Sequence, residues 1–194
     1  KIIDFNKKNI SLLMSSNAHM VLYPISEKDH NLVVILRNKI QNFTNDKKFD
    51  STKKILNEAI LKKNDNLKSL FSGGLKYWPI YTSESPINSK LKNVFYLGDA
   101  FYTFSPTMAQ GASQSIEGAM ELLQVLKKDT NDKQNLYFTN RLSRTKIINK
   151  RSKFNYFVFH FSNKLLVGLR NLVLKNIIKS KKFTESYLGR VFRK

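Results

Sequence analysis

The stretch LGDAFYTFSPTMAQGASQSIEGAMELL, from Leu97 to Leu123, contains the residue types best suited to bind a ligand. The chain has 194 residues and a formal net charge of +20, yet this stretch has no Lys or Arg and has three carboxylates, Asp99, Glu117 and Glu121. Gly98 and Asp99 follow an apolar run, and small residues come after them. A glycine, an acidic acceptor and a helix N-terminus together suit an oxygen-rich or anionic ligand. A plain turn between strand and helix, with Asp99 capping the turn, explains the same residues about as well.

The elements that would position these residues follow from the local pattern. Asn93 to Leu97 is a short apolar run and predicts a strand that ends at Gly98. Ser105 suits the N-cap and Pro106 the first position of a helix, so we expect one helix from Pro106 to about Leu126. Its apolar face would contain Ile116, Ala119, Met120, Leu123 and Leu126. Gly111 costs about 1 kcal/mol in a helix relative to Ala, which suggests that another body approaches the backbone there.

Short β-branched and apolar runs separated by turn formers predict an antiparallel meander before this stretch. Later segments have helical periodicity, with one further short strand between them. The expected strands are Ile10–Ser15, Ala18–Ile25, Asn31–Leu36 and Leu75–Tyr81, and the expected helices are Asp50–Lys63 and Asn163–Lys182.

Composition narrows the function classes. The sequence has no Cys, which excludes a disulfide framework and a cysteine nucleophile. It has no long uncharged apolar run and no signal peptide at its start. It begins with Lys1 inside what reads as structured sequence, so we expect a fragment of a longer protein. The three histidines His19, His30 and His160 are far apart, and none has a metal-ligand partner at useful spacing.

The basic charge is concentrated in the C-terminal third. Residues 127–194 contain 18 Lys and Arg against 3 Asp and Glu, a local net charge of +15. Such a segment attracts nucleic acid, anionic lipid or an acidic protein. The Lys-, Asn- and Ile-rich composition of an AT-rich genome explains the same charge without any partner.

The stretch GDA followed by SPTMAQGASQSIEGA resembles the second flavin-binding motif of the FAD-dependent aromatic hydroxylases, the para-hydroxybenzoate-hydroxylase-like flavoprotein monooxygenases. The resemblance covers about residues 18–193 and is greatest to the salicylate and 3-hydroxybenzoate hydroxylase branch. Segments that match the family pattern are AHMVLYPI, NLVVIL, WPIYTSESPINSKLKNVFYLGDA, RLSRTKIINKRSKFNYFVFH, LRN and YLGRVF. Tyr102 stands where the family has His, and Phe101 stands where it has Ala.

The resemblance implies FAD as cofactor and NAD(P)H as reductant. It implies that Asp99 accepts hydrogen bonds from the ribityl chain, that Gly98 admits the cofactor and that Pro106 lies near the reactive edge of the flavin. Gly111, Ala112 and Ser113 would offer backbone N–H groups to the pyrimidine end of the ring. No residue is expected to act as a catalytic acid or base, and no metal site is expected.

The implied fold class is α/β (α+β): a partial substrate domain over 1–82, the C-terminal part of an FAD-binding domain over 83–130, and basic helices over 131–194. The N-terminal dinucleotide-binding unit, with its Gly-x-Gly-x-x-Gly turn, is missing from the sequence. We therefore expect the C-terminal portion of an enzyme, inactive by itself, whose partners are its missing N-terminal half and a small aromatic substrate.

Two alternatives stay open at this point. The first is a ubiquinone-biosynthesis hydroxylase acting on a prenylated ring. The second, of another class, is a basic module that binds a membrane surface or nucleic acid, although nucleic acid is not expected because the basic segment is helical with an apolar stripe. In Asn163–Lys182 the residues Leu165, Leu169, Leu172 and Val173 share one face, which either packs on the flavin domain or contacts a membrane. The expected location is cytoplasmic, with membrane association at the cytoplasmic face left open.

Overall fold

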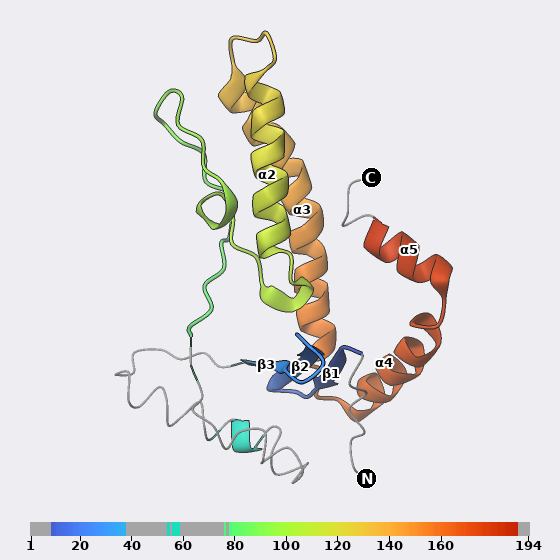
Figure 1. Ribbon diagram of the computed structural model, residues 1–194. Helices are drawn as coiled ribbons and strands as arrows, with labels where there is room; N and C mark the ends of the chain where they lie inside the picture. The colour runs from blue at the N-terminus through green and yellow to red at the C-terminus, as the bar shows by residue number, and fades with distance from the viewer. Residues whose placement is uncertain (1–8, 38–53, 55, 59–75, 77, 190–194) are drawn as a thin grey trace. The chain divides into compact units, whose positions relative to one another are not determined.

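The computed structural model describes residues 9–37, 54, 56–58, 76 and 78–189 (Figure 1). The chain divides into two compact units, each made of two separate stretches of sequence. The first unit contains residues 1–78 and 158–173, and the second contains residues 79–157 and 174–194. The division into a partial substrate domain over 1–82, part of an FAD-binding domain over 83–130 and basic helices over 131–194 stays a prediction.

The first unit contains a three-stranded antiparallel sheet in the order β1-β2-β3. The strands are β1 (Ser11–Met14), β2 (Ala18–Pro24) and β3 (His30–Leu36). Met20 on the central strand pairs with Leu13 and with Val34, and it is fully buried with Ala18 and Leu56. Alternation along β2 places every second side chain in this core because the side-chain period of a strand is two. The predicted meander is confirmed.

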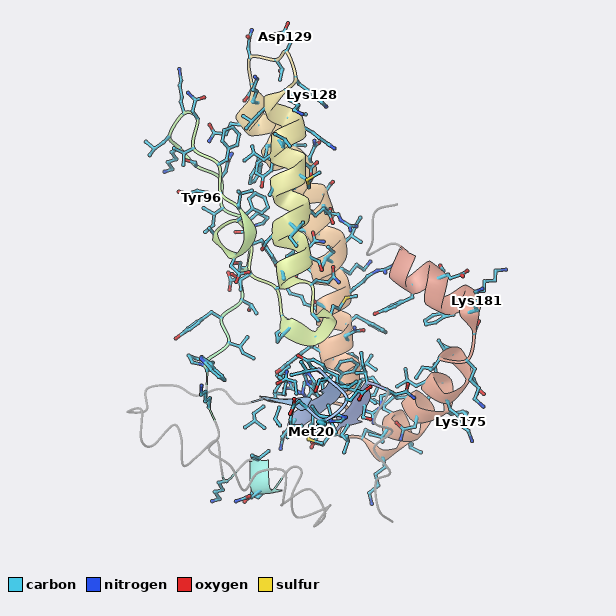
Figure 2. All side chains as sticks on the ribbon, viewed as in Figure 1. Met20, Tyr96, Lys128, Asp129, Lys175 and Lys181 are labelled. Carbon is cyan, nitrogen blue, oxygen red and sulfur yellow. The ribbon has the colours of Figure 1, made fainter. Side chains whose placement is uncertain are left out.

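The second unit is built on two long antiparallel helices, α2 (Gly111–Leu126) and α3 (Lys133–Phe159), which lie side by side (Figure 1). The last two residues of α3 belong to the first unit. Their connecting loop contains Lys128 and Asp129, both labelled at its tip in Figure 2. Phe101, Tyr102, Val125 and Tyr137 form the apolar core between the helices and the preceding loop. This mixture of antiparallel strands and helices confirms the predicted fold class.

The orientation of α2 differs from the sequence prediction. The helix buries Gln114, Gly118, Glu121 and Val125, and most of this set is polar or small. The outer face of α2, formed by Ile116, Met120, Leu123 and Leu126, is exposed. The expected apolar face therefore does not pack on the described part of the chain.

Several element boundaries were predicted wrongly. Residues 93–97 form no strand, because Asn93 has a left-handed φ of 61° and residues 94–97 have no ladder partner among the described residues. Of 75–81, residues 76 and 78–81 are described and are irregular. The basic C-terminal segment forms two helices, α4 (Lys164–Ile177) and α5 (Lys181–Gly189), in place of one. Most of the helix predicted over 50–63 lies outside the described residues, although 54 and 56–58 are helical.

Among the described residues, no helix combines the length and the apolar character that crossing a bilayer requires.

Candidate functional site

The Gly98–Asp99 pair begins a 3-10 turn, η3 (Gly98–Ala100). The first position of this turn favours glycine. Gly98 has a φ of +55°, and a Cβ built there would lie 2.6 Å from Oγ of Ser115. Its carbonyl accepts hydrogen bonds from the backbone N–H groups of Phe101 and Tyr102, both at 3.0 Å. The turn therefore brings the backbone of the GD pair against the first turns of α2 and leaves Asp99 exposed.

The helix after the turn begins later than predicted, at Gly111. Pro106–Met108 forms a separate 3-10 turn, η4, and Ala109 follows it with a left-handed φ of 50°, which ends that turn. A left-handed residue interrupts α-helical hydrogen bonding, so the single helix expected from Pro106 is wrong in its first five residues. The Ser152 hydroxyl donates to the carbonyl of Ser105 at 3.1 Å and fixes this irregular segment to α3.

The first turn of α2 presents backbone N–H groups that have no acceptor within the helix. Ala112 and Ser113 are exposed there, and a Cβ added at Gly111 would meet no atom within 4 Å. The first intrahelical hydrogen bond runs from the N–H of Gln114 to the carbonyl of Gln110 at 2.9 Å. The space over Gly111 and the partial positive charge of the helix end suit an oxygen-rich or anionic group.

Gly98 and Gly111 line the same small cavity, whereas the other predicted site residues do not. Its other lining residues are Phe101, Tyr102, Phe104, Gln114, Tyr137, Arg141 and Thr145. Pro106 and Asp99 are exposed outside it. The structure thus brings the two glycines together and places Asp99, Pro106, Ala112 and Ser113 around them on the surface of the loop and helix end.

Two buried polar atoms, one on a residue that lines the cavity and one on the residue before Gly111, have no hydrogen-bond partner within the described part of the chain. They are the hydroxyl of Tyr102 and the amide oxygen Oε1 of Gln110, on residues that are 3% and 6% exposed. Burial also raises the pKa of the Tyr102 hydroxyl, so it stays a neutral donor. An unsatisfied buried polar atom is costly, and a polar ligand at this end of α2 would relieve that cost.

Beneath the first turns of α2 lies a cluster of charged and polar side chains, here named the arginine cluster: Gln114, Glu117, Glu121, Arg141 and Arg144. The guanidinium of Arg144 donates to both oxygens of Glu117, at 2.7 and 3.0 Å. Arg141 donates to Glu117 at 3.2 Å and to Glu121 at 3.5 Å. The Arg141 guanidinium also donates to the backbone carbonyl and to the Oε1 atom of Gln114, at 3.3 and 3.0 Å. These bonds attach the first turn of α2 to α3.

The two positive charges of Arg141 and Arg144 balance the two negative charges of Glu117 and Glu121. Burial acts to raise the pKa of Glu117, but hydrogen bonds from Arg144 and Gln114 and the charges of both arginines outweigh it, and the pKa is lowered. Glu117 is therefore an ion-paired anchor and not a proton donor near neutral pH. Neither arginine was predicted to be a functional residue, although their spacing of three residues on a helical segment indicates a shared face.

Further contacts tie α3 to the loop before α2. The hydroxyl of Tyr137 donates to the carbonyl of Tyr96 at 3.1 Å, and Thr107 donates to the carbonyl of Ser152 at 2.8 Å. Tyr96 is labelled in Figure 2 on the segment that runs alongside α2. With the arginine cluster, these bonds make α3 a rigid support for the whole GD loop and helix start.

The first unit contains a histidine pair that no pattern in the sequence predicts. Nδ1 of His19 on β2 lies 3.2 Å from Nε2 of His160, although the residues are 141 positions apart. Both rings are buried, and burial, followed by the neighbouring His160, lowers the pKa of His19 to about 4. No group of three or more metal-ligating side chains occurs among the described residues.

No protein-family model matches the sequence, and no curated protein matches it. The fold is that of solved flavoprotein structures. It matches HpxO of Klebsiella pneumoniae, crystallised with FAD and uric acid, with a TM-score of 0.70 at 13% identity, over 94% of this chain and 47% of that chain. It also matches pqsL of Pseudomonas aeruginosa, described as a probable FAD-dependent monooxygenase, with a TM-score of 0.54 at 18% identity, over 78% of this chain and 44% of that chain.

These likenesses confirm the resemblance to FAD-dependent hydroxylases at the level of the fold. The chain spans about half the length of the solved structures it matches.

Proposed function

We propose that this chain is the FAD-binding C-terminal part of a flavin-dependent monooxygenase, which hydroxylates a small aromatic substrate with NAD(P)H and dioxygen. The observation that carries the proposal is the start of α2, where open space over Gly111 meets free backbone N–H groups and the turn at Gly98. The shared fold of two flavoprotein structures supports the same conclusion. The uric acid bound by one of them supports a small planar substrate.

The residues fit a flavin in chemical terms. The carboxylate of Asp99 is exposed at the GD turn, where it can accept hydrogen bonds from ligand hydroxyls. Pro106 would border the ring, and the N–H groups of Gly111, Ala112 and Ser113 would face its polar end. The unsatisfied hydroxyl of Tyr102 and Oε1 of Gln110 add a donor and an acceptor beside that place.

The protein's own role in this proposal is binding, orientation and exclusion of water. The flavin, when bound, would supply the redox and oxygen-transfer chemistry, so no side chain of this chain is assigned as an acid or base. The partial positive charge at the start of α2 would favour negative charge on the group in front of it. The arginine cluster keeps that helix end in place and contributes no net charge of its own.

The outer face of α2 supports a partner region outside this chain. Ile116, Met120 and Leu123 are 67%, 56% and 48% exposed, and no Lys or Arg lies between Leu97 and Leu123. Such a contiguous uncharged face is typical of a surface that packs against protein. We propose that the N-terminal half of the same enzyme covers it.

The test is flavin binding by the full-length enzyme that contains this chain, and by two variants of that enzyme. Binding is measured by flavin absorbance and by equilibrium dialysis. Asp99→Ala should weaken flavin binding about ten- to a hundred-fold, because a hydrogen bond to a charged group contributes roughly 1.5–3 kcal/mol. Gly111→Ala should also weaken binding while the free energy of unfolding stays equal or rises, because its methyl group meets only open space in the protein. The chain by itself should bind FAD weakly or not at all.

Matched controls are Asp129→Ala, at the exposed tip of the α2–α3 loop, and Gly168→Ala, a second helical glycine with nothing within 4 Å of an added Cβ. Both should leave flavin binding unchanged. Full flavin retention by Asp99→Ala and Gly111→Ala together would remove this helix end from the cofactor site.

A further inference from the structure

Helix α4 turns its leucines outward. The leucine face of α4, formed by Leu165, Leu169, Leu172 and Val173, has exposed fractions of 83%, 58%, 60% and 41%. These residues lie on one side of the helix, since they recur at spacings of three and four. This apolar face, which ends at the exposed Asn176, marks an interaction surface.

Polar contacts at other positions fix this orientation. Oδ1 of Asn163 caps the helix by accepting from the backbone N–H groups of Leu165 and Leu166, at 2.9 and 3.4 Å. On the side away from Leu165, the buried guanidinium of Arg170 donates to the carbonyls of Val158 and Phe159, both at 3.2 Å. Arg170 thus attaches α4 to the end of α3, and the leucine face is left on the opposite side.

The charge around this face has one sign. Lys164 and Lys175, the latter labelled in Figure 2, are exposed along one border of the leucine face. From Lys133 to Thr184 the sequence has no Asp or Glu at all. The outer face of α2 is different, because α2 itself has no Lys or Arg and the first cation, Lys127, comes only after its last residue. The two faces therefore suit different partners, and the cationic border of α4 complements an anionic surface.

We propose that α4 lies flat on an anionic phospholipid surface, with its leucine face inserted at the headgroup boundary and its lysines at the lipid phosphates. An interfacial helix needs a large apolar face, a basic border and no great length, and the 14 residues of α4 meet those conditions. A second copy of the chain is a poor occupant, because two such borders would bring cations of like charge together.

The experiment is sedimentation of the intact protein with two kinds of vesicle, phosphatidylcholine alone and phosphatidylcholine mixed with phosphatidylserine. The protein should bind the mixed vesicles and not the neutral ones, and binding should persist at about 0.15 M salt, where purely electrostatic attraction is strongly screened. No flavin turnover is measured, so the result does not depend on the proposed enzymatic activity.

Two double variants separate insertion from charge. Leu169→Ser with Leu172→Ser should lower binding to the mixed vesicles about tenfold or more, because two large apolar side chains no longer leave water. Lys164→Glu with Lys175→Glu should lower it by a similar factor. The matched control is Ile80→Ser with Ile87→Ser, two isoleucines outside the helices that are each 52% exposed, and it should bind normally.

Four outcomes overturn the proposal. They are no binding of the unaltered protein to mixed vesicles, equal binding to both vesicle types, full binding by the leucine variant, and a loss of unfolding free energy by the leucine variant without vesicles that exceeds the roughly 1 kcal/mol attributable to the lower helix propensity of two Ser residues. The last would show that protein already covers the leucine face, from a second copy or from the rest of the enzyme.

Discussion

The two units bury polar groups in different ways. In the second unit, the arginine cluster buries formal charges that balance one another through short hydrogen bonds. In the first unit, His19 and His160 bury two rings whose Nδ1 and Nε2 atoms lie 3.2 Å apart, and the low pKa of His19 keeps that ring neutral at pH 7. A charged pair is stabilised by keeping its charge, whereas burial favours the neutral form of the His19 ring. Removal of a partner should therefore disrupt the first cluster, and acid should disrupt the second.

The largest effect is expected from Arg141→Ala. This change removes the guanidinium that bonds Gln114, Glu117 and Glu121, and breaking a buried ion pair typically costs about 3–5 kcal/mol. Urea unfolding of the intact protein measures the loss. Lys146→Ala, an exposed change on the same helix, is the control and should stay within about 0.5 kcal/mol. A loss below about 1 kcal/mol for Arg141→Ala would show that the cluster contributes little to stability.

The next effect is the response of the histidine pair to acid. The folded pKa of His19 is about 4 and its ordinary value is 6.5, so the unfolded chain binds a proton in that interval and the folded chain does not. The free energy of unfolding should therefore fall by about 3 kcal/mol as pH drops from 6.5 to 4, since each pKa unit corresponds to about 1.4 kcal/mol.

His19→Gln should flatten this part of the pH profile, because the amide keeps a polar group without a titrating proton. Unfolding curves collected at several pH values for both proteins give the two slopes. Equal slopes would mean that another group causes the acid sensitivity.

The sequence predicted the features that depend on neighbours along the chain. The three strands of the meander follow from alternation, and the GD turn follows from Gly98, whose left-handed φ and closeness to Ser115 require a glycine. The helix start was missed because Ser105 and Pro106 favour an α-helix locally, while the left-handed Ala109 breaks it. No local pattern predicts that break.

The packing of α2 could not be predicted from its own sequence. Amphipathicity pointed to Ile116 and Met120 as the buried side, but the described chain buries the opposite side. Glu117 finds its partners 24 and 27 residues away, on a helix whose distance and direction the sequence does not reveal. Gly98, Asp99 and Gly111 could be selected from residue type and position, Pro106, Ala112 and Ser113 only from the family resemblance, and the arginine cluster beneath them only from the structure.

The smallest expected effect is the acid response of Glu117, which sharpens the contrast with His19. Its pKa lies below the ordinary value of 4.5 because the hydrogen bonds and charges of its partners outweigh the effect of burial. A carboxyl group with a lowered folded pKa adds stability above its unfolded pKa, and that stability is lost as pH falls through the folded pKa. The loss should therefore begin near pH 4.5 and continue below it, whereas the histidine step is largely complete there.

Glu117→Gln tests this point because it removes the charge and keeps the shape. At pH 7 the variant should be less stable by about 1.5 kcal/mol, the typical contribution of a hydrogen bond to a charged group. As pH falls below about 4.5, the difference between the two proteins should shrink, since protonation gives Glu117 the same neutral state that Gln has at every pH. The comparison is made from unfolding free energies on either side of that pH. A constant difference down to pH 3 would show that the charge of Glu117 is not what holds α2 to α3.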